Sequence, residues 1–321
     1  MTSPGKLRAL DACATPAGHF NVLAVDHRGN LWEALEKYGP VDDAAFLAFK
    51  RDTISRLAPY ASAVLTDPTY GIGMGIAEGW LPAHLGLLAP LEVTNYSLKM
   101  SDRAYTPVPH WSVGKIRRVG GQGVKLLLYY HPQAENAATQ RAIAADVVAS
   151  CAAHDLPLFL EPIVFSTDPA TPLTASGFRD AVVGAAADFS ALGIDILKSQ
   201  FPCDPALTSD EREWKSALRD LDAACTVPWA LLSAGVSYDV FRRQAQMACD
   251  AGCSGVIVGR AVWNEAVTAP SPAARRDMLG AICAPRVQEL GEICAAGRPF
   301  REKLSVNTAF NVDWTQAYGE L

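Results

Sequence analysis

The sequence lacks the features of several large classes of protein. None of its apolar stretches reaches about 18 residues, the length at which a hydrophobic run can span a membrane as a helix. Residues 1–20 lack the basic start and apolar core of a signal peptide, so we expect a cytoplasmic protein. No stretch rich in Pro, Gly or Ser divides the chain, so we expect residues 1–321 to form one domain.

Basic charge and metal-ligand spacing are also scarce. The 321 residues carry a formal net charge of -6 and no sustained stripe of Lys and Arg, which argues against nucleic acid as the main partner. The eight cysteines are scattered, and no second Cys or His pair joins Cys249 and Cys253 to complete a zinc site. The six histidines show no ligand spacing. We therefore expect free thiols in a reducing compartment.

Half of the residues are hydrophobic, and apolar segments rich in β-branched residues recur along the chain. Nearly continuous apolar runs are typical of strands covered on both faces, as in a parallel sheet. Eight such strands are predicted, at Val22–Asp26, Ala61–Thr66, Leu91–Tyr96, Val124–Tyr130, Pro157–Glu161, Ile194–Lys198, Trp229–Ser233 and Gly255–Gly259.

Amphipathic helical patterns lie between most of these strands, at Asp42–Leu57, Glu135–His154, Ser176–Leu192, Ser209–Cys225 and Tyr238–Ala251. The connection between the second and third strands is less regular, because Gly71–Gly75 is typical of a loop and a short helix follows around Pro82–Leu88. This alternation predicts an α/β fold, a single (β/α)₈ TIM barrel over about residues 20–265. An open doubly wound sheet is the alternative. A C-terminal helical extension, residues 270–321, has a long helix at Pro272–Gly297 and then an irregular tail with Phe310, Trp314 and Tyr318.

In a barrel of this kind the active site lies at the carboxyl ends of the strands. Five of these ends carry ionisable residues or glycines, namely Asp26-His27-Arg28, Glu161, Lys198, Ser233-Ala234-Gly235 and Gly259-Arg260. Loops after the seventh and eighth strands often bind phosphate, and Arg260 would add a bidentate donor. We therefore predict a phosphate site at the last two ends. Taken alone, Asp26 could instead cap a turn, and Glu161 could form a surface ion pair.

Lys198 ends a short apolar run, and Ile194, Ile196 and Lys198 would share one face of a strand. A buried amine is costly to protonate, and a neutral amine is a nucleophile that forms a Schiff base with a carbonyl substrate. The simpler alternative is a lysine that extends its ammonium group to water. Lys125 would add a second cation nearby if its strand face lines the barrel rather than facing a helix.

Taken together, these segments resemble the class I tagatose-1,6-bisphosphate aldolase family and its relatives, the sulfofructose-1-phosphate aldolases. The matching stretches are 23–29, 124–130, 160–162, 195–198, 232–236 and 251–263. The resemblance implies a (β/α)₈ fold, a homo-oligomer, and chemistry without a metal or cofactor. It places Lys198 on the Schiff-base lysine, Glu161 on the acid/base carboxylate, and Lys125 and Asp26 on polar positions of the active site. The phosphate-binding region falls on Ser233, Gly235, Gly259 and Arg260.

Two positions depart from the family pattern. His27 stands where glutamine is usual, and Ser199-Gln200 stands where Val-Glu is common. We expect His27, Arg28, Gln200 and Ala234 among the substrate-binding residues. The resemblance implies an aldolase that cleaves a ketose 1-phosphate, of the tagatose, fructose or sulfofructose type, to dihydroxyacetone phosphate and an aldehyde. A non-catalytic phosphosugar-binding regulator and a phosphosugar isomerase are the alternatives.

Overall fold

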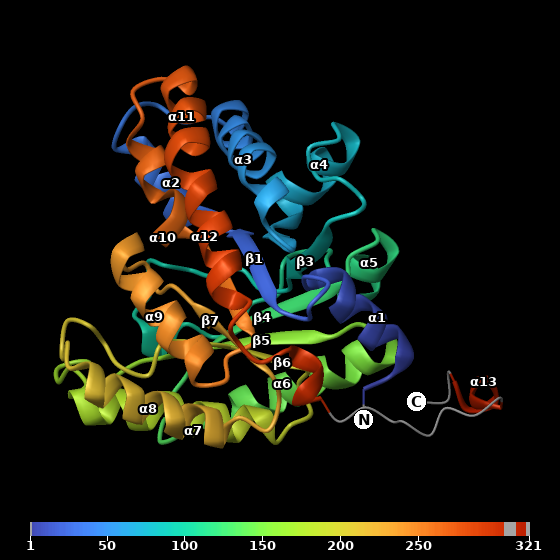
Figure 1. Ribbon diagram of the computed structural model, residues 1–321, viewed down its shortest axis with the longest axis vertical. Helices are drawn as coiled ribbons and strands as arrows, with labels where there is room; N and C mark the ends of the chain where they lie inside the picture. Colours follow the sequence, from blue (N-terminus) through green and yellow to red (C-terminus); the bar gives the residue numbers. More distant parts are fainter. Residues whose placement is uncertain (1, 305–312, 319–321) are drawn as a thin grey trace.

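The computed structural model describes residues 2–304 and 313–318. Eight parallel strands close into a barrel, in which each strand pairs with its neighbours in sequence and β1 pairs with β8. Figure 1 shows the strands at the centre with the helices around them. The strands are β1 (Phe20–Val25), β2 (Ala63–Thr66), β3 (Gly86–Pro90), β4 (Gly123–Tyr130), β5 (Leu158–Val164), β6 (Ile196–Ser199), β7 (Trp229–Leu232) and β8 (Gly255–Val258). The closed barrel confirms the predicted fold and excludes the open sheet.

Helices fill the connections between the strands. The α-helices are α1 (Pro4–Cys13), α2 (Gly29–Glu36), α3 (Asp43–Leu57), α4 (Gly73–Ala77), α5 (Val113–Arg118), α6 (Ala137–Ala153), α7 (Ala175–Ser190), α8 (Glu211–Ala224), α9 (Tyr238–Asp250), α10 (Arg260–Trp263), α11 (Pro272–Met278), α12 (Ala284–Cys294) and α13 (Trp314–Ala317). Single turns of 3₁₀-helix are η1 (Ala58–Tyr60), η3 (Met100–Asp102), η4 (Asn264–Thr268) and η6 (Phe300–Glu302). Two π-helical turns are η2 (Pro68–Ile72) and η5 (Leu279–Cys283). The five predicted amphipathic helices are present as α3, α6, α7, α8 and α9.

The third strand was predicted in the wrong place. β3 is Gly86–Pro90 rather than Leu91–Tyr96, and the predicted helix around Pro82–Leu88 does not form. Leucine and alanine favour helices, but β3 is buried along its whole length and pairs with both β2 and β4. Sheet pairing therefore overrides the local preference of this segment.

The Gly71–Gly75 stretch was also predicted wrongly, because it is helical in η2 and α4 rather than a loop. The Asp67 side chain caps this helical segment by accepting hydrogen bonds from the backbone N–H groups of Thr69 and Tyr70. Gly71 lies so close to Thr66 that a side chain at this position would collide with it. Gly71 and Gly75, which lies against Trp80, therefore serve close packing, not an irregular backbone.

The C-terminal extension contains the predicted long helix as α11, η5 and α12, with the π-turn just before Pro285. In η6, Phe300 is buried and stacks on Phe20 with ring centroids 5.3 Å apart. Of the predicted aromatic tail, Trp314 and Tyr318 pack on each other, and Phe310 lies outside the described residues.

The amino-terminal end of the barrel is closed. Phe20 and Phe159 fill the barrel interior there, while Leu10 and Phe300 pack beneath them in the same buried cluster. Lys6 of α1 donates a 2.9 Å hydrogen bond to Asp195 at the start of β6. With this end plugged, a ligand can enter only at the opposite end, where the strands present their carboxyl ends.

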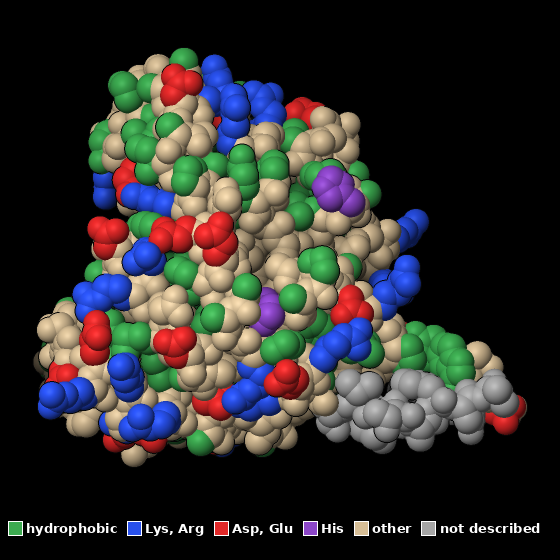
Figure 2. Space-filling view, in the orientation of Figure 1, with side chains coloured by type: hydrophobic (Ala, Val, Ile, Leu, Met, Phe, Trp, Pro, Cys, Tyr) green, Lys and Arg blue, Asp and Glu red, His purple; other side chains and the backbone are tan. Residues whose placement is uncertain are grey.

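In the view of Figure 2, acidic and basic side chains are interspersed over most of the surface, and a small group of basic side chains lies at the top, over α3. Within residues 2–304 and 313–318, no helix combines the length and the apolar character needed to cross a membrane.

Candidate active site

A pocket of about 620 Å³ opens at the carboxyl ends of the strands. It is lined by all twelve residues predicted for the site, namely Asp26, His27, Arg28, Lys125, Glu161, Lys198, Gln200, Ser233, Ala234, Gly235, Gly259 and Arg260. Ser199 is not among the lining residues, and its hydroxyl donates to the backbone carbonyl oxygen of Gln200. Of the two departures after Lys198, only Gln200 can therefore contact a ligand directly.

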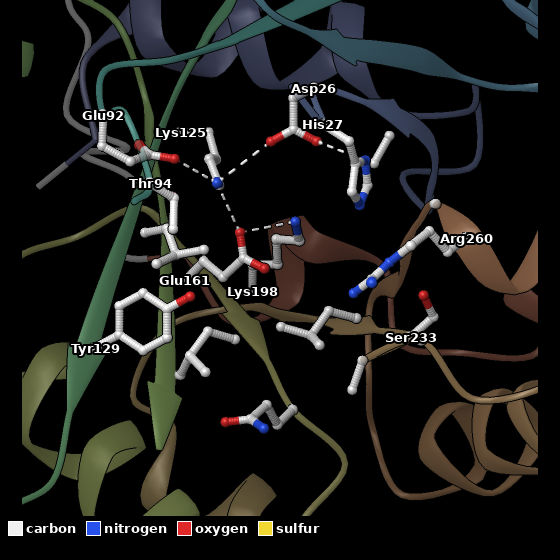
Figure 3. Close-up of a pocket in the computed structure, with 18 of the residues that line it drawn as sticks. Asp26, His27, Glu92, Thr94, Lys125, Tyr129, Glu161, Lys198, Ser233 and Arg260 are labelled. Atoms are coloured by element: carbon white, nitrogen blue, oxygen red, sulfur yellow. Dashed lines mark hydrogen bonds and ion pairs between the residues drawn. The ribbon is translucent and has the colours of Figure 1, made fainter. Parts of the chain in front are cut away.

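Two lysines and three carboxylates meet at the centre of this pocket (Figure 3). Lys198 Nζ donates to Glu161 Oε2 at 2.9 Å. Lys125 Nζ lies 3.0 Å from the same oxygen, 2.6 Å from Glu92 Oε1 and 3.4 Å from Asp26 Oδ2. Lys125 and Lys198 are only 3% and 5% exposed, so neither extends its ammonium group to bulk water. The inward orientation predicted for Lys125 is confirmed.

The charges in this cluster set the protonation states of its members. Burial alone would lower the pKa of Lys125, but Glu161, Glu92 and Asp26 outweigh it and raise that pKa well above its ordinary value. Burial would raise the pKa values of Asp26 and Glu161, but Lys125 and Lys198 lower both below their ordinary values. For Glu92 burial prevails over Lys125 and raises the pKa. Glu161 is therefore a carboxylate at neutral pH, and Glu92 is the member of the cluster that is easiest to protonate.

The carboxylate beside Lys198 changes what the sequence implied about this residue. Burial disfavours an ammonium group, whereas an opposite charge at hydrogen-bond distance favours it. A nucleophilic amine at Lys198 therefore requires a proton transfer, and the 2.9 Å hydrogen bond gives Glu161 direct access to that proton. The backbone pairing between β5 and β6 ends at Leu160 and Leu197, immediately before this pair of side chains.

A different wall of the pocket is suited to an oxyanion. After β7 the backbone turns through Ala234 and Gly235, with φ angles of 47° and 81°. A Cβ on Gly235 would lie 3.4 Å from the guanidinium of Arg260, so the absence of a side chain leaves that space open. No carboxylate among residues 2–304 and 313–318 forms an ion pair with Arg260. An uncompensated arginine beside a glycine turn provides charge and backbone N–H donors of the kind that bind phosphate.

His27 lies between the central cluster and this wall. Its ring meets Trp263 edge to face at a centroid distance of 5.2 Å, and its Nδ1 is 3.8 Å from Asp26 Oδ1. Burial lowers the pKa of His27 to about 3 despite the opposing charge of Asp26. The imidazole is therefore neutral at physiological pH and can offer one N–H donor to a ligand.

Two further predicted residues are held by backbone groups. Arg28 donates to the carbonyl oxygen of Glu92, which ties the loop after β1 to the loop after β3. Gln200 accepts a 2.7 Å hydrogen bond from the backbone N–H of Val164 through its Oε1. This bond fixes the orientation of the amide, so Gln200 can act toward a ligand as a hydrogen-bond donor.

Comparison with known proteins assigns the chain to a family. A model described as the DeoC/LacD family aldolase matches residues 21–265, which is most of the chain. The protein belongs to the DeoC/LacD aldolase family. It is therefore an aldehyde-lyase, and the family predicted from the six matching stretches is confirmed.

Curated relatives of this DeoC/LacD aldolase match over most of their length. Tagatose 1,6-diphosphate aldolase 2 of Enterococcus faecalis is 29% identical over 94% of this chain and 98% of its own. Tagatose 1,6-diphosphate aldolase 1 of Streptococcus pyogenes is 30% identical over 78% of this chain and 82% of its own. The crystal structure of an archaeal fructose 1,6-bisphosphate aldolase shares the fold, with a TM-score of 0.60 and 19% identity. The match covers 91% of this chain and 100% of the archaeal chain.

Several residues that line the pocket of this aldolase were not predicted from the sequence. Glu92 was not recognised as a site residue because the predicted third strand, Leu91–Tyr96, has Glu92 near its start rather than at its carboxyl end. A strand that ends at Pro90 places Glu92 at a carboxyl end, and this position is the signal that would have found it. Tyr96, Met100 and Arg103 come from the irregular loop between β3 and β4, where no periodic pattern points to a site.

The described part of the chain contains no group of three or more His, Cys, Asp or Glu residues that could hold a metal ion. All eight cysteines are buried and free.

Proposed function

We propose that the protein is a class I aldolase that cleaves a ketose 1-phosphate to dihydroxyacetone phosphate and an aldehyde. The observation that carries this proposal is the buried Lys198–Glu161 pair, 2.9 Å apart, which shares its pocket with the uncompensated Arg260. The names of the curated relatives favour tagatose 1,6-bisphosphate as one substrate. Cleavage of sulfofructose 1-phosphate and assembly as a homo-oligomer stay predictions.

The reaction begins when Lys198 passes its proton to Glu161 and attacks the C2 carbonyl of the substrate. The carbinolamine that forms loses water and becomes an iminium ion. The 1-phosphate binds Arg260 and the backbone N–H groups near Gly235 and Gly259, which places C2 over Lys198. A fixed anion at C1 also orients the rest of the substrate toward the central cluster.

The bond between C3 and C4 then breaks. Glu161, once more a carboxylate after its proton has left with the water, removes the proton from the C4 hydroxyl. The electron pair of the C3–C4 bond moves to the iminium, the aldehyde leaves, and an enamine remains on Lys198. Protonation of the enamine at C3 and hydrolysis by water release dihydroxyacetone phosphate and the free amine. Lys125 holds Glu161 in place and balances its charge during these proton transfers, and Asp26 pairs with Lys125 from the other side.

A cleavage assay tests this function. Purified enzyme is mixed with tagatose 1,6-bisphosphate, fructose 1,6-bisphosphate or sulfofructose 1-phosphate, and dihydroxyacetone phosphate is measured with a coupled NADH-dependent reductase. We expect cleavage of at least one substrate, equal rates with and without a metal chelator, and background rates for Lys198→Ala. Interconversion of ketoses without release of dihydroxyacetone phosphate would identify an isomerase, and binding without turnover would identify a regulator.

A further inference from the structure

His27 gives the pocket a side chain that can gain or lose a proton at the edge of the proposed phosphate site. It directly follows the end of β1 and lines the pocket, and its side chain is 16% exposed. An imidazole is neutral or cationic according to its surroundings, whereas the amide of a glutamine at this position would be neutral at every pH. The groups on either side of the ring therefore decide its charge.

Asp26 lies on one side of the ring. Its Oδ1 is 3.8 Å from Nδ1 of His27, and its Oδ2 is 3.4 Å from Nζ of Lys125. The distance to Nδ1 is too long for a hydrogen bond, and this buried nitrogen has no hydrogen-bond partner within the described part of the chain. Burial would raise the pKa of Asp26, but Lys125 and Lys198 lower it below its ordinary value. The group that faces Nδ1 is therefore a carboxylate.

The proposed phosphate site lies on another side of the ring. A Cβ on Gly259 would be 2.9 Å from Cε1 of His27, so the ring lies against the backbone that leads into Arg260. Trp263, in the same short helix as Arg260, meets the ring edge to face at a centroid distance of 5.2 Å. Figure 3 shows the imidazole between Asp26 and Arg260. His27 is thus placed between a carboxylate and an anion site.

A neutral imidazole cannot donate to both neighbours, because it has only one N–H group. With its proton on Nδ1 it has no donor for a phosphate, and with its proton on Nε2 it presents a lone pair to the Asp26 carboxylate. An imidazolium has both N–H groups and can donate one to each anion. The protonated form of His27 therefore matches this position once a phosphate is bound.

In the empty pocket the surroundings keep the ring neutral. Burial lowers the pKa of His27 to about 3, and Asp26 opposes this effect. Three cations from three different elements lower the pKa further, namely Arg260 of α10, Lys50 of α3, which is paired with Asp67, and Lys198 of β6. A phosphate bound to Arg260 reverses the balance, because it offsets that cation and adds about two negative charges beside the ring.

We propose that His27 binds the 1-phosphate of the substrate as an imidazolium, so that the site takes up one proton together with the phosphate. The inference rests on the proposed function and adds to it that the affinity for a dianion rises as the pH falls. The proton comes from solvent and returns to solvent when the phosphate-bearing product leaves. The pH dependence therefore belongs to binding and not to the cleavage step.

Sulfate is the probe that tests this coupling. It stays a dianion between pH 5 and pH 7, whereas a phosphate monoester takes up a proton of its own near pH 6. Its dissociation constant is measured in wild type at pH 5 and pH 7 by following the backbone N–H signal of Gly259 by NMR. An opposite charge nearby raises a pKa by about 1–3 units, so a dianion should bring the titration of the bound ring to about pH 5.5–6. We expect sulfate to bind about 3- to 10-fold more tightly at pH 5 than at pH 7.

Two variants isolate the contribution of His27. His27→Gln is the matched control, because an amide donates to the anion without titrating, and its dissociation constant should differ less than twofold between the two pH values. Arg260→Ala should weaken sulfate binding at both pH values, which shows that the Gly259 signal reports this site.

The ring nitrogen signals of His27 give a direct measurement of its protonation. They are assigned by their absence from the spectrum of His27→Gln. At pH 5 we expect the signals of a neutral ring without sulfate and those of a largely protonated ring at saturating sulfate.

Four results would overturn the inference. They are equal affinities at pH 5 and pH 7 in wild type, the same pH dependence in His27→Gln, a ring that stays neutral with sulfate bound, and no binding of sulfate. None of these measurements needs turnover. If no ketose phosphate is cleaved although the coupling is present, the proposed function fails and a proton-linked anion site remains. If ketose phosphates are cleaved and the coupling is absent, only the inference about His27 fails.

Discussion

Replacing Glu161 with glutamine separates two roles of this residue, the acceptance of protons and the pairing with two ammonium groups. One oxygen of Glu161, Oε2, accepts from Lys198 at 2.9 Å and lies 3.0 Å from Lys125. A glutamine oxygen at the same place can accept both contacts, so we expect the pocket to keep its shape. The amide cannot take a proton from Lys198 or from the C4 hydroxyl of the substrate.

Loss of a general base of this kind costs about 10²- to 10⁴-fold in rate, or roughly 3–5 kcal/mol of transition-state stabilisation. We therefore expect kcat of Glu161→Gln to fall within this range in the coupled assay for dihydroxyacetone phosphate. Because hydroxide can deprotonate Lys198 in place of Glu161, part of the rate of formation of the Lys198 Schiff base should return as the pH is raised. A kcat within tenfold of wild type at neutral pH would refute the assignment of Glu161.

Glu92→Gln is the matched control for this experiment. Glu92 also contacts Lys125, at 2.6 Å, but burial raises the pKa of this carboxyl and makes its neutral form easier to reach. An amide that imitates the neutral form should cost less than tenfold in kcat. If Glu92→Gln and Glu161→Gln were equally damaging, the role of proton acceptor could not belong to Glu161 alone.

Three further predictions concern residues around the cluster. Lys50→Met should lower the free energy of unfolding by about 3–5 kcal/mol in urea titrations, because it leaves the buried Asp67 unpaired, and adding Asp67→Asn should recover most of the loss. Native His27 has a pKa lowered to about 3 from 6.5, so below pH 6.5 the unfolded chain binds more protons and stability falls as the pH falls. When the pH is lowered from 7 to 5, the free energy of unfolding of His27→Asn should therefore fall by about 2 kcal/mol less than that of wild type in urea titrations. An equal fall in both proteins would show that His27 does not cause this pH dependence. Gly235→Ala puts a Cβ at a φ of 81° and 3.4 Å from the Arg260 guanidinium, so KM for the ketose phosphate should rise several-fold with a smaller change in kcat. An unchanged KM would mean that this turn does not contact the substrate.

The barrel and most of the polar residues at the carboxyl ends of its strands could be predicted from the sequence, because both follow from local patterns. Strands buried on both faces give continuous apolar runs, and the residue that ends each run lies at the same end of a closed barrel. Lys198, Glu161 and Arg260 could be found in this way. The inward orientation of Lys125 could also be expected, because every second residue of a strand shares one face. Lys125, Leu127 and Tyr129 alternate along β4 in this way, and all three line the pocket.

The remaining parts of the site depend on contacts that a local pattern does not contain. Leu91–Tyr96 has the composition of a strand, and only pairing with both neighbouring strands selects Gly86–Pro90 in its place. Glu92 was not predicted as a site residue because the third strand was placed too late in the sequence. Arg103 lies on an irregular loop, and its side chain is oriented by Tyr129, which is 26 residues away in sequence. The sequence placed Lys198 and Glu161 at the ends of neighbouring strands, but it did not indicate the hydrogen bond between them, which favours an ammonium group where burial alone indicates a neutral amine.

The central claim is that Lys198 forms a covalent bond with the substrate, and borohydride trapping tests it most directly. Wild-type enzyme is incubated with dihydroxyacetone phosphate, reduced with sodium borohydride, digested and analysed by mass spectrometry, with Lys198→Ala treated in parallel. We predict one stable adduct of a reduced dihydroxyacetone phosphate on the peptide that carries Lys198, together with loss of activity in the wild type. No adduct, or an adduct on Lys125 that persists in Lys198→Ala, would contradict the account.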